Sequence, residues 1–235
     1  MEHDAGWYPV PFLDERVEPL CCAYCGKSEQ TTLDHVPPRV FLDSPLPSMN
    51  PIGVRACKPC NLSFSAAEEY VAVLLDVICH GAADVSQWRH KTRRAVSGNT
   101  RLLSRAASAA ANMPDRCDLA HEDHGVGLVM RKLAVGHWAM NMGDRSYTDP
   151  SYVSLHDGAG LSFQKIDAYV TSTLGERCLF PEVGSKAFIS AVTTGRTSVD
   201  RWRTVQPGRY RYRIEESGIA VLLGDRFFGM ARWQY

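Results

Sequence analysis

The chain has 235 residues, enough for one large domain or two modest ones, and its formal net charge at pH 7 is zero. No stretch approaches the roughly 18 consecutive apolar residues of a membrane helix, and the N-terminal segment lacks the basic start and apolar run of a secretory signal. We therefore expect no membrane partner and a cytoplasmic, reducing setting. In such a setting, close cysteine pairs indicate metal binding rather than disulfides.

Prolines interrupt the first 20 residues, which predicts a loose N-terminal arm over residues 1–20. From Cys21 onward, two Cys-x-x-Cys pairs flank a short strand that we expect to end near His35, because Pro37 and Pro38 follow it. These features predict a zinc-knuckle domain over residues 21–82. Residues 83–235 form a C-terminal region of unknown role.

Helical spacing of apolar residues recurs after Asn61 and predicts an amphipathic helix that ends near Gly81. We expect one or two helices over residues 85–112, with a break around residues 97–99. Further helices are expected over about 126–141, 163–174 and 184–194, and the helix near 127–141 fits either the core or a dimer contact. The stretch 143–160 is rich in Gly, Asp, Ser and Pro and predicts a loop.

The C-terminal tail changes character, because from about residue 209 its residues alternate between apolar and polar. Turn sequences at Ser217-Gly218 and Gly224-Asp225 divide it and predict an antiparallel meander of three strands. The expected fold class is α+β, with the zinc-knuckle unit followed by a mostly helical region and this meander.

Four cysteines have the spacing of a structural zinc site: Cys22, Cys25, Cys57 and Cys60. A Cys-x-x-Cys turn presents two thiolates to one ion, and two such turns supply the four ligands of a closed tetrahedral zinc site. Cys21 adjoins Cys22 and is the alternative ligand. Four buried cysteines without metal, or a redox pair, are the other interpretations.

An Asp-His dipeptide, Asp34-His35, lies between the two cysteine pairs. A carboxylate suits a hard cation such as Mg²⁺, and a neutral imidazole can take a proton from water near pH 7. Adjacent residues of a strand point to opposite faces, so the two side chains diverge unless the strand ends there.

The order and spacing of these pieces resemble the HNH endonuclease family, whose ββα-metal core often carries a four-cysteine zinc knuckle. The matching text is CAYC, LDHVPPRVF and CKPCNLSFS, between residues 22 and about 70. The resemblance implies that His35 is the general base and that Asp34 binds a catalytic Mg²⁺ or Mn²⁺ ion. Asn61 would be the second ligand or would fix the loop that carries His35; a helix N-cap is the plain structural alternative.

The last histidine of the family pattern is missing from the expected helix. Ser65, Glu68 and Glu69 stand there instead. Glu69 follows Asn61 by about two helical turns, which makes it a further candidate ligand. Glu68 and Glu69 fit equally well as solvated helix charges.

Two segments carry only basic charge, one between Asp84 and Asp115 and one between Asp200 and Glu215. Such rows suit phosphate contacts, although solubilising faces have the same composition. In the second segment, Arg209, Arg211 and Arg213 would share one strand face opposite two tyrosines. The predicted nucleic-acid contacts are Arg39, Arg93, Arg94, Arg209 and Arg211.

Together these features predict a metal-dependent HNH-type endonuclease that hydrolyses phosphodiester bonds, with DNA as the expected substrate. Structural zinc and catalytic Mg²⁺ or Mn²⁺ are its expected cofactors, and a homodimer is an open alternative. A non-catalytic zinc module that binds nucleic acid or protein is the competing hypothesis. An RNA-cleaving effector that uses the same site is the third.

Overall fold

A computed structural model describes residues 21–27, 30–46, 53–114, 117–142, 149–174, 202–215 and 217–233. The predicted arm over residues 1–20 and the predicted helix over 184–194 lie outside these ranges. The α+β prediction is confirmed, because helices accompany two antiparallel sheets and the C-terminal sheet contains the meander. Of the described helices, none is long and apolar enough to cross a membrane.

The N-terminal part is a β-hairpin followed by a helix, which is a ββα unit. Strand β1 (Thr31–His35) pairs antiparallel with β2 (Gly53–Cys57), and the register places His35 opposite Gly53. A short 3-10 helix, η2 (Arg39–Phe41), follows Pro37 and Pro38 in the connection. The predicted strand and its end at His35 are therefore confirmed.

Helix α1 (Lys58–His80) leads directly out of β2. It begins earlier than predicted, because Cys57 is already its N-cap, and the second cysteine pair thus spans the strand-to-helix junction. Its predicted end is confirmed: Gly81 has φ 79° and its N–H donates to Val77 O at 2.7 Å. Glycine adopts this left-handed conformation without steric cost, which makes it a good helix terminator.

The other helices follow in chain order. They are η3 (Val85–Gln87), α2 (His90–Ser97), α3 (Thr100–Asn112), α4 (Leu119–Glu122), α5 (His124–Met142) and α6 (Phe163–Leu174). The predicted break around residues 97–99 is confirmed, since Asn99 caps α3 by accepting from Leu102 N–H at 3.0 Å.

Five antiparallel strands form the second sheet, in the order β3-β7-β6-β5-β4. Their bounds are β3 (Tyr152–Asp157), β4 (Arg203–Gln206), β5 (Tyr210–Glu215), β6 (Gly218–Leu223) and β7 (Phe227–Arg232). The predicted meander corresponds to β5, β6 and β7. The predicted loop over 143–160 is wrong in part, because β3 lies within it and pairs with β7. Its polar composition concealed a strand whose partner is about 70 residues further along the chain.

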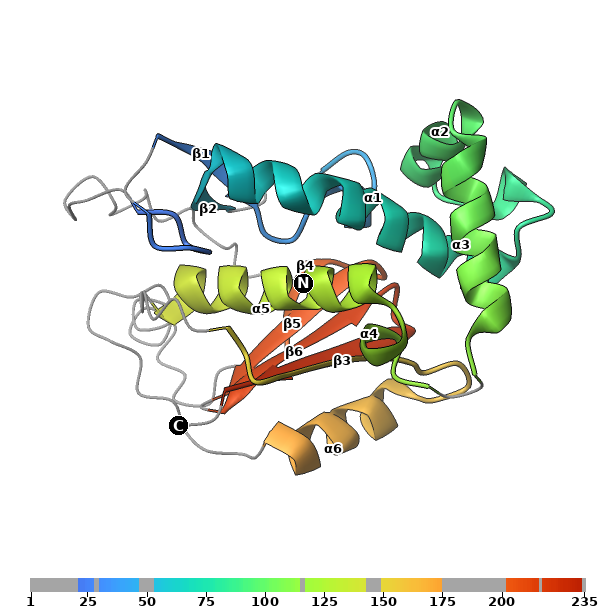
Figure 1. Ribbon diagram of the computed structural model, residues 1–235. Helices are drawn as coiled ribbons and strands as arrows, with labels where there is room; N and C mark the ends of the chain where they lie inside the picture. The colour runs from blue at the N-terminus through green and yellow to red at the C-terminus, as the bar shows by residue number, and fades with distance from the viewer. Residues whose placement is uncertain are drawn as a thin grey trace, which may run out of the picture.

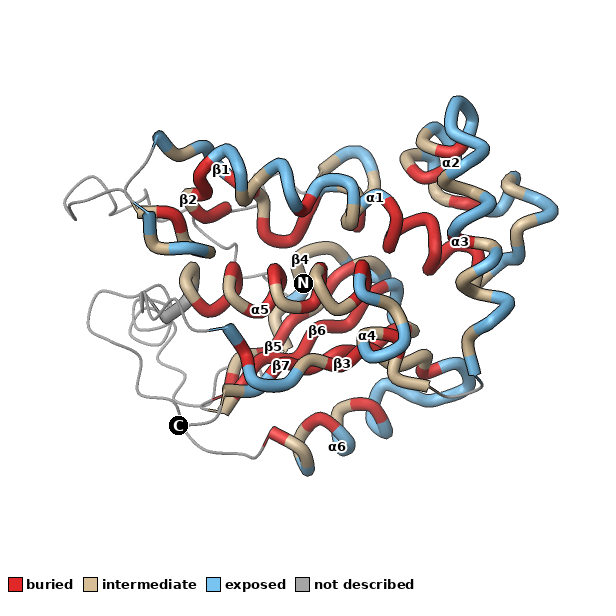
Figure 2. The backbone as a smooth tube through the Cα atoms, viewed as in Figure 1, coloured by how far each residue is buried: buried red, intermediate tan, exposed pale blue. Residues whose placement is uncertain are grey.

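Helices cover both faces of this sheet, with α5 between the sheet and α1, and α6 on the other side (Figure 1). Because helices cover both faces of the sheet, every residue of β6 is buried. Ile219, Val221 and Leu223 join the large core with α1 and α5, whereas Ala220 and Leu222 pack with α6. Figure 2 shows the buried residues of α1, α5 and β6 in red, and exposed residues in pale blue on α2 and on part of α1.

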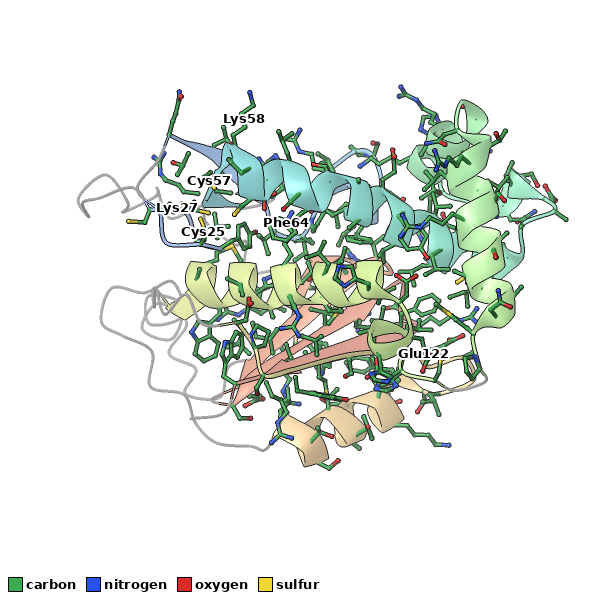
Figure 3. The ribbon with its side chains drawn as sticks, in the orientation of Figure 1. Cys25, Lys27, Cys57, Lys58, Phe64 and Glu122 are labelled. Atoms are coloured by element: carbon green, nitrogen blue, oxygen red, sulfur yellow. The ribbon has the colours of Figure 1, made fainter. Side chains whose placement is uncertain are left out.

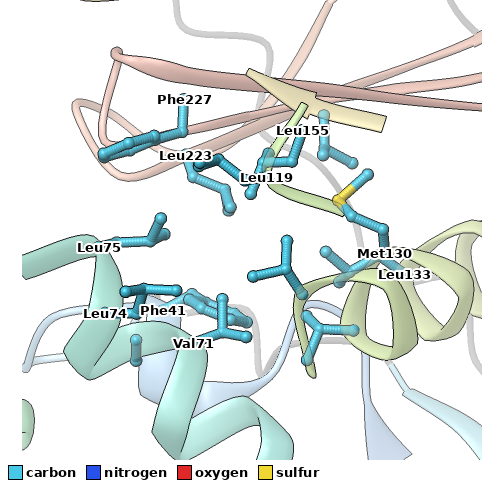
Figure 4. Packing of buried hydrophobic residues seen from close by; sticks show 14 of the residues in the cluster. Phe41, Val71, Leu74, Leu75, Leu119, Met130, Leu133, Leu155, Leu223 and Phe227 are labelled. Carbon is cyan, nitrogen blue, oxygen red and sulfur yellow. The ribbon is translucent and has the colours of Figure 1, made fainter. Parts of the chain in front are cut away.

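The large core is continuous across the predicted boundary at residue 82. Figure 4 shows Leu74 and Leu75 of α1, Met130 and Leu133 of α5, and Phe227 of β7 within one packed cluster. The described part of α5 therefore contributes to the core, as the first of its two predicted roles requires. The ββα unit is anchored to the C-terminal region through this packing.

Candidate functional site

Two backbone turns bring the predicted zinc ligands together. In the first, Gly26 N–H donates to Cys22 O at 2.9 Å, and Gly26 has φ 73°, a conformation that glycine adopts easily. Ala23 N–H donates to Arg55 O at 2.8 Å, which fastens this turn to β2. The second turn is the junction of β2 and α1, and Figure 3 shows Cys25 and Cys57 at this end of the hairpin.

The ligand atoms of Cys22, Cys25, Cys57 and Cys60 all lie within 4.8 Å of one another. The Cys25 and Cys57 Sγ atoms are 3.7 Å apart. A zinc tetrahedron with Zn–S bonds of about 2.3 Å has S···S edges of about 3.8 Å, so the arrangement fits one zinc ion. Cys22, rather than Cys21, belongs to this group. The site would supply structural cross-linking, because four thiolates leave no open position.

Crowding of the thiols has an electrostatic consequence. Burial raises the pKa of the Cys60 thiol, and its hydrogen bonds with Cys57 and Cys25 raise it further. Burial acts to raise the pKa of the Cys22 thiol as well, but hydrogen bonds from the backbone of Cys57, Tyr24 and Cys25 outweigh burial and lower it. A divalent ion would favour the thiolate form of all four ligands. The donor set is thus poised to release protons when it binds metal.

The Asp34 carboxylate lies beside the cysteine cluster and is enclosed by Tyr24 of the first cysteine turn and by side chains of α1 and α5. Asp34 is 5% exposed. Its Oδ1 accepts a hydrogen bond from Lys132 Nζ of α5 at 2.8 Å, and its Oδ2 accepts one from the Tyr24 hydroxyl at 2.7 Å. Lys132 also donates to the Glu68 carboxylate of α1. Both oxygens of Asp34 are therefore engaged by groups of the chain itself.

The aromatic rings of Phe64 and Tyr24 pack against this cluster. The Lys132 ammonium lies 5.5 Å from the centroid of the Phe64 ring, and Tyr24 meets Phe64 edge to face at 4.9 Å. Phe64 lies between α1 and α5 (Figure 3). Burial raises the pKa of Glu68 despite the nearby Lys132, and burial and Asp34 raise the pKa of Tyr24. Tyr24 thus remains a hydrogen-bond donor.

His35 ends β1 and is partly exposed. Because the pairing register continues to His35, the alternation of the strand directs its side chain to the face opposite Asp34. Leu33, on the same face as His35, is 53% exposed. The strand therefore separates a buried polar face that carries Asp34 from an accessible face that carries His35.

Asn61 and Glu69 do not join Asp34. Asn61 Nδ2 donates to the Thr32 hydroxyl at 3.0 Å, and Asn61 is not the helix N-cap, which is Cys57. Glu69 is exposed, whereas its neighbour Glu68 reaches the Asp34 cluster. Both oxygens of Asp34 already accept hydrogen bonds from Lys132 and Tyr24, and the Asn61 amide nitrogen is bonded to Thr32. The predicted ligand pair for Mg²⁺ or Mn²⁺ therefore does not fit this arrangement, and we derive no chemical step through such an ion.

The first basic segment divides into anchored and exposed side chains. Arg89 contacts Asp76 at 3.0 Å and donates to two backbone carbonyls, so its charge is used within the fold. Lys91 donates to the carbonyls of Arg39 and Leu42, which brings α2 against η2. Arg39, Arg93 and Arg94 are exposed on these two neighbouring elements.

Three arginines of the second basic segment, Arg209, Arg211 and Arg213, contact carboxylates. Arg209 lies 2.5 Å from Asp43 and Arg211 lies 3.5 Å from Asp225. Strand alternation separates the arginines from Tyr210 and Tyr212 as predicted, but the arginine face is not open. Arg213 is 1% exposed and contacts Asp167 of α6 at 3.0 Å. These three arginines therefore do not form the uncompensated row of charge that the sequence indicates.

The sequence did not indicate Lys132 or Tyr24, and for Glu68 it left open a place near the site or a solvated helix charge. One signal was present: Lys132 follows Val129 by three residues and precedes Leu133, so it lies on the face of the helix that carries these buried apolar residues. A charge on the buried face of a helix requires a partner, but the sequence does not say which carboxylate it is.

Comparison with family models, with curated proteins and with solved structures finds no match to this chain.

Proposed function

We propose that this protein is an HNH-type phosphodiester hydrolase in which a zinc-braced ββα unit presents His35 as the general base. The observation that carries the proposal is the four-cysteine cluster at one end of the β1–β2 hairpin, whose strand β1 has His35 at its other end. The spacing of the cysteines around Asp34-His35 supports the family resemblance. DNA is the proposed substrate, and an RNA-cleaving effector would use the same residues.

In the proposed reaction, His35 takes a proton from water, and the water oxygen attacks phosphorus in line with the leaving oxygen. The bond from phosphorus to the leaving oxygen breaks, and that oxygen is protonated by solvent. Exposed Arg39, four residues beyond His35, is the proposed contact for a neighbouring phosphate. The zinc site acts by holding the hairpin and does not enter the chemistry.

A second function has its own supporting observation. The Asp34 carboxylate is engaged by Lys132 and Tyr24, and Asn61 faces Thr32, so these residues hold the ββα unit together. This arrangement favours a non-catalytic zinc module that binds nucleic acid or protein. The hydrolase requires His35 as its general base, whereas the zinc module does not require His35 for catalysis.

The deciding experiment is cleavage of plasmid, linear duplex, single-stranded DNA and RNA by the zinc-loaded protein, each with Mg²⁺, Mn²⁺ or chelator. We expect His35→Ala to lose cleavage by at least about a hundredfold, the usual contribution of a general base, while retaining zinc. His121→Ala, which alters an exposed histidine on α4, is the matched control and should cleave normally. Equal cleavage by the wild type and His35→Ala would refute the assignment, and binding without cleavage would favour the module.

A further inference from the structure

The Asp34 cluster combines two carboxylates with one ammonium in a buried site. The exposed side-chain fractions are 1% for Lys132, 6% for Asp34 and 15% for Glu68. Lys132 contacts one oxygen of each carboxylate, so its nitrogen stands at the point on which both acidic groups converge. That is the position in which a bound cation would satisfy them both.

Removing either the ammonium or a carboxylate from this site would strongly reduce the stability of the folded protein. A buried ion pair that loses one partner leaves an uncompensated buried charge, which destabilises the folded state. The ammonium is tethered to α5, which the large core fixes in place through Val129, Met130 and Leu133. A divalent ion from solution would therefore compete with a cation that is already present at high effective concentration.

We propose that the Lys132 ammonium is the cation of this site, and that it excludes a divalent ion from Asp34 in the folded protein. Lys132 is then a positioning residue. Through Asp34 it holds the end of β1 next to His35, in place of the metal that the family resemblance implies. The C-terminal region thus completes the ββα unit by supplying the charge that the unit lacks.

This inference deepens the proposed hydrolase function, and it rests on that function only for its bearing on cleavage. Its own test measures ion binding, so the two can fail separately. Asp34-dependent ion binding that appears when Lys132 is removed would support the inference even if no variant cleaved any substrate. Cleavage that depends on His35 would support the function even if Lys132 had no influence on ions.

The experiment is Mn²⁺ binding to the zinc-loaded full chain, measured by electron paramagnetic resonance and by thermal stabilisation. We expect Asp34→Asn to leave the Mn²⁺ binding of the wild type unchanged, because Lys132 already occupies that carboxylate. Lys132→Met should gain one Mn²⁺ site at least about tenfold tighter than any in the wild type. The double variant Asp34→Asn/Lys132→Met should lack the new site.

Lys165→Met, which removes an exposed lysine of α6, is the matched control and should gain no site. Wild-type Mn²⁺ binding that Asp34→Asn abolishes would overturn the inference, as would a folded Lys132→Met protein that gains no Mn²⁺ site. If Lys132→Met unfolds without metal, refolding on addition of Mn²⁺, followed by circular dichroism, is the expected result. If it stays unfolded with Mn²⁺, the comparison of the wild type with Asp34→Asn decides the matter.

Discussion

Asp157 and Arg226 show how a single pair of side chains secures one end of the sheet. Asp157 is the last residue of β3, and Arg226 lies in the turn before β7. Arg226 Nε and Nη2 donate to the two carboxylate oxygens at 2.7 and 2.6 Å. Burial of Asp157 acts to raise its pKa, but hydrogen bonds from Arg226 and from Ala159 N–H outweigh burial and lower it. The ionised form is therefore the one that the fold stabilises.

The stability of the protein should depend on this ionisation. Because the pKa of Asp157 is lower in the folded state, its contribution is present above the unfolded value of about 3.9 and is lost as the pH falls through the folded value. We expect Asp157→Asn to lower the free energy of unfolding by about 1–2 kcal/mol near neutral pH, where the charged hydrogen bonds are complete. Urea unfolding at neutral and strongly acidic pH measures the difference, which should shrink in acid.

Asp225→Asn is the control for this prediction. Asp225 makes only a 3.5 Å contact with Arg211 and its side chain is 47% exposed, so its pair should contribute little. Its φ of 51° is one that asparagine also tolerates. A difference for Asp157→Asn that is equal at both pH values would show that the carboxylate charge is not the stabilising feature.

At the scale of elements, the local signals in the sequence were sufficient for most helices. Apolar periodicity located α1 and α6, and the Ser-Gly-Asn break separated α2 from α3, because these features depend on near neighbours in the chain. Strand β3 was missed for the opposite reason. Its pairing with β7 is a long-range contact, and its polar flanks resemble a loop.

For the candidate site, too, the sequence predicted the local features but not the long-range contacts. Cysteine spacing predicted the four-cysteine cluster, because each pair lies in one local turn and only two turns had to meet. The partner of Asp34 could not be read from the sequence, because Lys132 lies 98 residues away on α5. Helix α5 meets the hairpin closely: a Cβ atom at Gly136 would lie 2.7 Å from the Val36 side chain. That close packing is what places Lys132 beside Asp34.

For the molecule as a whole, a net charge of zero conceals an uneven distribution of basic side chains. Arg209, Arg211 and Arg213 are matched by carboxylates, whereas Arg39, Arg93 and Arg94 are exposed on the adjoining η2 and α2. If the protein binds nucleic acid as proposed, these three exposed arginines are the better candidates for phosphate contacts, because no carboxylate contact is found for them among the described residues.

The double variant Arg93→Ala/Arg94→Ala tests this surface. For duplex DNA, each lost phosphate contact should reduce the slope of log affinity against log salt concentration by about 0.9, so we expect a decrease of about 1–2. Fluorescence anisotropy with labelled DNA over a series of salt concentrations measures the slope. Arg209→Ala removes an arginine already paired with Asp43 and should change the slope little. The reverse ranking would locate the binding surface on the sheet.

The four-cysteine cluster lies at one end of the hairpin that carries both Asp34 and His35, and both proposed functions depend on its holding zinc. Zinc K-edge X-ray absorption of the protein purified under reducing conditions tests it most directly. We expect one zinc ion per chain with four sulfur neighbours at about 2.3 Å, unchanged in Cys21→Ser and lost or altered in Cys22→Ser. A well-folded protein without zinc, or an ion bound by nitrogen or oxygen at about 2.0 Å, would contradict it.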